Sequence, residues 1–242
     1  MTDSVNQTPL HGVDSLLHRL GFALLPPRCL ICDERGTNGV DLCASCHDRL
    51  PFNRVHCARC AMPMAVAAEA CGTCLRRPPP QDLTRSAFVY RAPLDRLLPR
   101  AKFHGDLAST RLLGRLMACE LADAERPQAL VPVPLHRDRL RRRGYDQALE
   151  LARPLARALA LPLRDDLLRR TRATAPQSRL ASPQRRRNLR GAFVVSTSGA
   201  LPMHVALVDD VMTTGATVEA AATALRRAGV VRVDVWVCAR VP

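Results

Sequence analysis

Apolar and polar positions near the C-terminus predict a strand, a short loop and a helix in succession. Residues 204–208 are mostly apolar and β-prone, as is typical of a buried parallel strand, and Asp209 and Asp210 follow where that strand is predicted to end. A loop of small and hydroxyl residues comes next. Apolar residues at helical spacing across 218–225, with Gly229 as a suitable C-terminal cap, then predict a helix whose one face packs on a sheet.

Similar patterns predict an α/β domain over most of the remaining chain. Apolar runs predict strands at 86–90, 129–135, 192–195 and 231–239, and helical spacing predicts helices at 93–100, 107–121 and 145–159. Pro132 and Pro134 cannot donate to a sheet ladder, so the second of these strands should end or become irregular there. The polar, basic stretch 163–190 is too long for a simple connection and predicts a lid or binding segment.

Before this domain, cysteines recur with a regular spacing. Four Cys-x2-Cys knuckles are separated by ten residues each, and their members are Cys29, Cys32, Cys43, Cys46, Cys57, Cys60, Cys71 and Cys74. Two knuckles supply the four sulfur ligands of one tetrahedral zinc ion, so the pattern predicts two structural Zn²⁺ sites. We prefer sequential pairing of the knuckles, with interleaved pairing as the alternative. A disulfide framework is the other alternative, but the chain shows no secretory signal.

The two cysteines outside the knuckles have a different interpretation. Cys119 falls in a predicted helix and Cys238 in the last predicted strand, where small buried thiols are common. The knuckle segment has almost no apolar core of its own, so the metal should supply most of its folding free energy. The proline-rich stretch 76–80 then predicts a stiff linker and a domain boundary.

The loop after Asp209 and Asp210 has the chemistry of a sugar-phosphate site. A helix N-terminus with small residues can receive a phosphate, and three threonines add hydroxyl donors. The two carboxylates can accept hydrogen bonds from vicinal hydroxyls, directly or through Mg²⁺. The predicted binding residues for the sugar phosphate are Val211, Met212, Thr213, Thr214, Gly215, Ala216 and Thr217. An ordinary helix cap with solvated carboxylates is the alternative, and other common phosphate-binding glycine motifs are absent from the sequence.

A second candidate for anion binding follows the 129–135 strand. Residues 136–144 contain five arginines, and a loop rich in guanidinium groups at the carboxyl end of a strand is suited to pyrophosphate. Arg143 is the preferred residue, because Gly144 beside it would let a ligand approach. A solvated basic helix face is the alternative. Lys102, in a polar turn, is interpreted either as a phosphate contact or as a solvated or paired lysine.

Composition adds a basic balance to this picture. The formal net charge is +14, which indicates an anionic partner such as nucleic acid, although Lys102 is the only lysine and a GC-rich genome would also supply arginines. Aromatic residues make up 3%, which argues against a base-stacking platform. No apolar run is long enough for a membrane span, and no signal peptide is recognised.

Taken together, these segments resemble the ComF family, also called the ComF/GntX group of phosphoribosyltransferase-like proteins. The resemblance extends from Cys29 to the last strand. Besides the knuckles, it rests on 102–106, 131–136, 143–148, Gln177, 187–189, 191–193 and 208–217. The last segment closely resembles the phosphoribosyl-pyrophosphate (PRPP) loop of type I phosphoribosyltransferases. Asp146 departs from the family, which usually has Asn there, so no phosphate contact is expected through that side chain.

The resemblance implies a fold and a set of roles. The fold would be a type I phosphoribosyltransferase-like parallel sheet with flanking helices, plus a small double zinc-ribbon module at the N-terminus. PRPP and Mg²⁺ would bind, with 213–217 on the 5′-phosphate and Asp209 and Asp210 on the ribose hydroxyls. Val133, Pro134 and Leu135, with Arg143, would stabilise the leaving pyrophosphate.

The family also implies a cytoplasmic role in natural transformation, acting on imported single-stranded DNA. Candidate partners are the competence helicase or other DNA-processing proteins. The weaker candidates for nucleic-acid contact are Arg139, Arg141, Arg142, Arg185, Arg186 and Arg187. The predicted domains are an N-terminal helical arm at 1–26, the zinc module at 27–77, and a phosphoribosyltransferase-like domain at 81–242 with a basic hood loop at 163–191. Two functions stay open: a Mg²⁺-dependent phosphoribosyltransferase, or an inactive nucleic-acid-binding adaptor on the same scaffold.

Overall fold

A computed structural model describes residues 27–103, 106–172, 189, 191–196 and 199–242. The chain divides into two compact units, Met1–Arg49 and Leu50–Pro242. The described part of the first unit holds the two N-terminal knuckles and the short helix α2 (Ala44–Asp48). Cys29, Leu42 and Cys46 are buried there.

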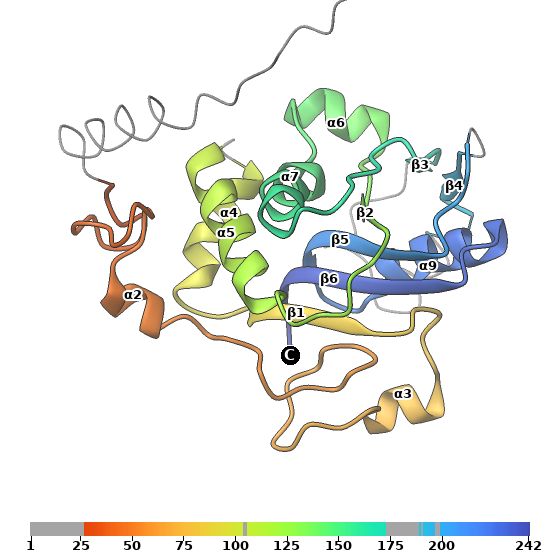
Figure 1. Cartoon of the computed structure of the whole chain (residues 1–242), viewed down its shortest axis with the longest axis horizontal. Coiled ribbons are helices and arrows are strands. Elements are labelled where there is room, and N and C mark those ends of the chain that lie inside the picture. The colour runs from red at the N-terminus through yellow and green to blue at the C-terminus, as the bar shows by residue number, and fades with distance from the viewer. Residues whose placement is uncertain (1–26, 104–105, 173–188, 190, 197–198) are drawn as a thin grey trace, which may run out of the picture. The chain divides into compact units, whose positions relative to one another are not determined.

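A four-stranded parallel sheet forms the centre of the second unit (Figure 1). Its strand order is β1 (Thr84–Val89), β6 (Arg232–Arg240), β5 (His204–Met212), β2 (Ala129–Pro132). The two central strands are apolar along nearly their whole length because helices cover both faces. The predicted α/β fold with a parallel sheet and flanking helices is therefore confirmed.

Helices on the two faces of the sheet have different neighbours. On one face lie α4 (Leu94–Phe103), α5 (Leu107–Glu120) and α7 (Gln147–Leu159), with α5 packed on α7. Gly114 of α5 allows this approach, since a Cβ atom there would lie 2.4 Å from Cγ of Pro154. On the other face lie α9 (Ala216–Ala228) and a two-stranded antiparallel ribbon, β3 (Leu168–Arg170) and β4 (Phe193–Val195).

Residues 50–77, with the last two knuckles and α3 (Gly72–Arg76), belong to the same compact unit as the sheet. The segment is bonded to edge strand β1: Asn53 N–H donates to Ala87 O, and Val89 N–H donates to Pro51 O, at 3.0 and 2.7 Å. Phe52 packs on Phe88 with ring centroids 5.4 Å apart. The predicted segmentation differs here, because it groups all four knuckles at 27–77, whereas the compact units separate them after Arg49.

Several predicted elements need correction. Strand β5 continues through Asp209 and Asp210 to Met212, because its backbone stays paired with β6 as far as Arg240. The predicted strand at 192–195 is β4, which pairs with β3 rather than joining the parallel sheet. The arginine-rich segment is the helix α6 (Arg137–Arg143), not a loop. Cys119 is exposed, whereas Cys238 is buried in β6 as predicted.

Candidate functional site

The loop between β5 and α9, residues 213–215, requires a glycine at its last position. Gly215 caps α9 with φ of 79°, and a Cβ atom there would lie 2.7 Å from Cε of Met212. Both conditions exclude a larger side chain without rearrangement. We call residues 213–215 the β5–α9 loop.

Thr214 in the β5–α9 loop carries an unsatisfied group. Its Oγ1 atom is buried and has no hydrogen-bond partner among the described residues. Buried hydroxyl groups are normally hydrogen-bonded, and exceptions occur at functional sites. Thr213 is exposed and Thr217 is half-buried in the first turn of α9. The loop and the first turn of α9 therefore bring three hydroxyl side chains to the N-terminal end of one helix, where the helix dipole favours an anion.

Asp209 and Asp210 are neighbours in β5 and so point to opposite faces of the sheet. Asp210 is 9% exposed and lines a small cavity with Leu98, Ala101, Thr110, Gln147 and Leu151 from the α4, α5 and α7 side. Asp209 is half-buried and lies close enough to Arg170 of β3 for its charge to oppose the lowering of the pKa of that guanidinium. The two carboxylates therefore offer one acceptor group to each side of the strand end.

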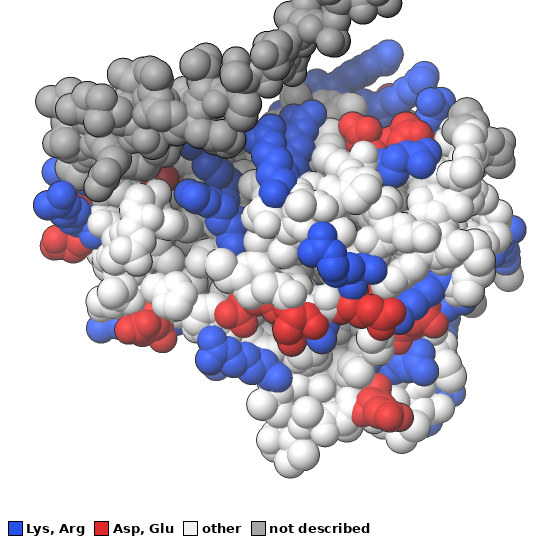
Figure 2. Space-filling model, viewed as in Figure 1, with Lys and Arg blue, Asp and Glu red and all other residues white. Residues whose placement is uncertain are grey.

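Arg170 is the arginine that lies near Asp209, and Arg139 of α6 lies near Arg170. Burial is the main cause that lowers the pKa of Arg170 to about 10, and the positive charge of Arg139 adds to the effect. The pKa of Arg139 is lowered by burial and then by Arg143 and Arg142. Like charges that are desolvated together favour an anion between them. Figure 2 shows basic side chains in the upper part of the view, where Figure 1 places α6.

Helix α6 and its caps set the geometry of these arginines. His136 Nδ1 accepts a hydrogen bond from Asp138 N–H at 3.3 Å, and Gly144 ends the helix at φ of 81°. The end of α6 therefore accounts for the glycine at position 144, and no ligand is needed to explain it. No residue of α6 is fully buried, and Arg143 donates to Oε1 of Gln147 at 2.9 Å. Its arginines therefore remain within reach of solvent and of a ligand.

The turn 133–135 is held by an acidic residue that sequence reasoning did not select. One carboxylate oxygen of Asp146 accepts from Leu135 N–H at 2.8 Å, and the other accepts from Ala148 N–H and Leu149 N–H at 3.1 and 3.3 Å. Burial nevertheless raises the pKa of Asp146, and the nearby Asp210 contributes. Asp146 thus joins the end of β2 to the start of α7. Its N-cap position, as an aspartate directly before the start of α7, was the available sequence signal.

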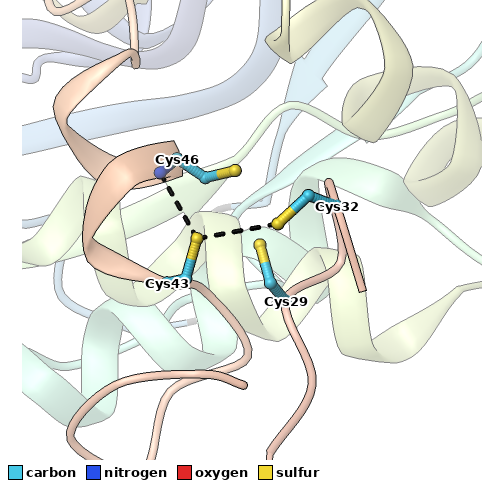
Figure 3. Close-up of side chains that lie close together, drawn as sticks. All are labelled: Cys29, Cys32, Cys43 and Cys46. Carbon is cyan, nitrogen blue, oxygen red and sulfur yellow. Dashed lines mark hydrogen bonds between the residues drawn. The ribbon is translucent and has the colours of Figure 1, made fainter. Parts of the chain in front are cut away.

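The knuckle cysteines form two groups, and the pairing is sequential. The first zinc site is Cys29, Cys32, Cys43 and Cys46, whose sulfur atoms converge in Figure 3, and the second zinc site is Cys57, Cys60, Cys71 and Cys74. Within each group the four sulfur atoms lie within 4.8 Å of one another. The Sγ atoms of Cys32 and Cys43 are 3.6 Å apart, and those of Cys60 and Cys71 are 3.7 Å apart.

These distances fit zinc. Four sulfurs at about 2.3 Å from a central ion lie about 3.8 Å from each other in a regular tetrahedron. Backbone amides also donate to the sulfurs, with Cys71 N–H 3.1 Å from Sγ of Cys57 and Cys46 N–H 3.4 Å from Sγ of Cys43. Such donors stabilise thiolates. Two four-cysteine zinc sites are thus supported, and His47 and His56 belong to neither group.

Comparison with known proteins agrees with this arrangement. Residues 22–75 match the model of the double zinc ribbon domain. The chain is 36% identical to Competence protein F of Haemophilus influenzae over 226 residues, which is 88% of this chain and 96% of that protein. It is 35% identical to DNA utilization protein YhgH of Escherichia coli K12, covering 82% of this chain and 90% of that one. Competence protein ComFC of Bacillus subtilis is 28% identical, covering 83% and 89%.

The chain belongs to the ComF family. The matched regions include both the knuckles and the sheet domain, so the recognised resemblance is confirmed over most of the chain. In the part of this ComF protein that the structure describes, no helix has the length and apolar character needed to cross a bilayer.

Some predicted site residues of this ComF protein cannot be placed. Arg185, Arg186 and Arg187, with most of the hood loop, lie outside the described residues. Lys102 belongs to α4, but its side chain also lies outside the description. Conversely, Arg170 was predicted only as part of the basic hood loop, and its approach to Asp209 had no signal in the sequence. It approaches Asp209 only because β3 folds back over the sheet.

Proposed function

We propose that this ComF protein binds PRPP, or a closely related ribose phosphate, together with Mg²⁺ at the carboxyl end of β5. We further propose that it acts in the cytoplasm, on or with imported single-stranded DNA in natural transformation. The names of its relatives, which refer to competence and DNA utilization, support the DNA-related part. The buried, unsatisfied hydroxyl of Thr214 in a glycine-capped loop is the observation that carries the ligand-binding part.

The β5–α9 loop is the proposed seat of the 5′-phosphate. Gly215 makes no side-chain hydrogen bond to the start of α9, and a helix N-terminus of this kind is where phosphate sites use backbone amides. The side chains of Thr213, Thr214 and Thr217 add hydroxyl donors. A phosphate there is also favoured by the positive end of the helix dipole.

The carboxylates are the proposed ligands of the ribose hydroxyls and of Mg²⁺. Asp209 and Asp210 would hold the Mg²⁺, which would offset the negative charge of the diphosphate. Asp209 is assigned to the ribose side because it faces the arginines. Asp210 is assigned a supporting role from the opposite face, where it accepts from Val211 N–H at 2.7 Å and so fixes the end of β5.

The proposed pyrophosphate contacts come from the arginine side. Arg143 and Arg139 of α6 and Arg170 of β3 approach one another although all are positively charged. An anionic diphosphate would relieve that repulsion. Guanidinium groups also form paired hydrogen bonds with phosphate oxygens. The turn 133–135, fixed by Asp146, would supply backbone donors beside them.

Phosphoribosyl transfer or its reverse is the reaction class that such a site suits. The bond from ribose C1 to the pyrophosphate oxygen breaks, the oxygen keeps the electron pair and leaves with the pyrophosphate, and a nucleophilic acceptor forms the new bond to C1. Fixed positive groups at the leaving oxygen therefore lower the barrier most. The alternative is an adaptor without turnover. The exposed arginines of α6, which would bind DNA phosphates with or without catalysis, favour that second function.

Thermal unfolding of the purified protein tests the ligand. PRPP with Mg²⁺ should raise the midpoint temperature of wild type, and Asp209→Ala with Asp210→Ala should abolish the rise. Wild type that gains no protection at millimolar PRPP does not bind it usefully, and the proposal then fails. A PRPP-dependent pyrophosphate-release assay, with and without single-stranded DNA, separates enzyme from adaptor. Pyrophosphate release faster than that of the double variant supports an enzyme. Thermal protection by PRPP without pyrophosphate release supports the adaptor.

A further inference from the structure

Arg240 links two parts of the molecule that the sequence places far apart. It ends β6, the strand between β1 and β5, and its backbone pairs with Val89 and Met212. Its side chain is buried, with 5% exposed. The guanidinium donates through Nε to Cys60 O at 3.0 Å, and through Nη1 to Met212 O at 3.1 Å and Thr213 O at 2.5 Å. One planar group therefore joins a zinc knuckle to the entrance of the β5–α9 loop.

The knuckle end of this link is held in place on both sides. Cys60 is a ligand of the second zinc site, with its sulfur 3.7 Å from that of Cys71. The preceding carbonyls are bound by β1, since Ala58 O accepts from Thr84 N–H at 2.7 Å and Arg59 O accepts from Thr84 Oγ1 at 2.8 Å. A bound zinc ion would thus fix Cys60 against a sheet edge that is already fixed.

The loop end of the link sets the position of the candidate phosphate site. Met212 and Thr213 are the last strand residue and the first loop residue, and Val241 N–H also donates to Met212 O at 3.0 Å. The Met212 side chain lies under Gly215, where a Cβ atom would clash. Displacement of these two carbonyls would therefore move Thr214 and Gly215 as well.

A buried guanidinium transmits such a displacement because its donors are arranged in a rigid plane. Losing one acceptor leaves a buried, charged donor unsatisfied, which is expensive. The side chain therefore follows Cys60 O or pulls away from the loop. Lysine has a single ammonium on a flexible stem and cannot hold the same acceptors in that plane.

We propose that Arg240 is a positioning residue through which the second zinc site holds the β5–α9 loop in its ligand-binding geometry. The ligand part rests on the proposed function, whereas the zinc-to-loop part does not. Coupling between two sites is reciprocal. Zinc in the second site should favour sugar-phosphate binding, and a bound sugar phosphate should retain that zinc.

Amide hydrogen exchange of the full-length protein tests the first part without any ligand. Cys71→Ser should empty the second zinc site and raise exchange in 211–217 at least tenfold. The matched control is Cys43→Ser, which empties the first zinc site in the other compact unit and should leave 211–217 unchanged within twofold. An equal response to both variants, or none to Cys71→Ser, overturns the proposal. If Cys71→Ser unfolds, stripping zinc from wild type with a graded chelator series replaces it, under the same criteria.

Zinc release to a chromogenic chelator tests the reciprocal part. In the Cys43→Ser protein, which retains only the second zinc site, PRPP with Mg²⁺ should slow release at least fivefold. Adding Arg240→Lys should reduce that effect below twofold while far-ultraviolet circular dichroism stays native. A purely structural arginine would change stability but leave the PRPP effect intact, and that result refutes the assignment. If PRPP does not protect wild type at all, the proposed function fails, and the exchange experiment alone decides the role of Arg240.

Discussion

Thr214→Val isolates the hydroxyl on which the proposed ligand site depends. Valine keeps the β-branched shape and replaces the buried Oγ1, which has no partner among the described residues, by a methyl group. In the unliganded protein, a buried hydroxyl without a hydrogen bond costs about 1–3 kcal/mol. Its removal should therefore stabilise the fold. A gain of about 1 kcal/mol corresponds to a rise of about 2–4 °C in midpoint temperature for a domain of this size.

The liganded protein should respond in the opposite direction. Rotation about χ1 presents the hydroxyl to a bound phosphate, and a hydrogen bond to a charged group contributes about 1.5–3 kcal/mol. The variant should then bind PRPP about 10- to 100-fold more weakly, since about 1.4 kcal/mol corresponds to a factor of ten. A more stable protein with weaker binding is the signature of a group kept for a ligand rather than for the fold.

Differential scanning fluorimetry and isothermal titration calorimetry measure the two effects on one preparation. The control is Thr223→Val in α9, the helix that follows the β5–α9 loop. Its hydroxyl donates to Glu219 O at 2.7 Å, so its loss should not raise the midpoint temperature and should leave PRPP binding unchanged. A Thr214→Val protein that is less stable and binds PRPP as wild type does would refute the reasoning, because the hydroxyl would then serve the fold.

Two further predictions concern charge. Asp106 caps α5 and accepts from Ser109 N–H and Oγ at 3.0 and 2.7 Å; desolvation opposes ionisation, but these bonds and Arg100 outweigh it and lower the pKa of Asp106. Because the pKa of Asp106 is lowered in the folded state, its carboxylate stabilises the fold at neutral pH, and this stabilisation is lost as the pH falls through the folded pKa. Asp106→Ala should therefore lower the free energy of unfolding by about 1 kcal/mol at pH 7, and the difference should shrink toward zero in acid. Chemical denaturation at a series of pH values measures it. Arg141→Ala with Arg142→Ala should reduce the magnitude of the slope of log affinity for single-stranded DNA against log salt concentration by about 1.4. The control is Arg85→Ala, which removes a partner of Asp123 and should change this slope little. Equal slopes for both proteins would exclude these two arginines from the DNA contact.

Local patterns were sufficient for much of this structure. Strand β5 and helix α9 follow from an apolar run and a 3.6-residue period, and Gly215 and Gly229 adopt the positive φ that favours glycine. The spacing of the knuckles fixed the zinc chemistry, because four sulfurs per ion is a stoichiometric requirement. The segment 137–143 was predicted as a basic loop, but a run rich in arginine has no apolar period that would distinguish a loop from a solvated helix.

The sequence by itself determined which elements form, how many zinc sites exist and which loop is suited to a phosphate, since these depend on neighbours within a few residues. Only the tertiary structure decided that Asp209 and Asp210 face opposite sides of a continued strand, and that Arg170 approaches Asp209. It also decided that Arg240 joins Cys60 to Thr213, across 180 and 27 residues of chain. The physical reason is that such contacts arise from strand pairing and burial between distant segments, and no local periodicity encodes the partner of a buried charge.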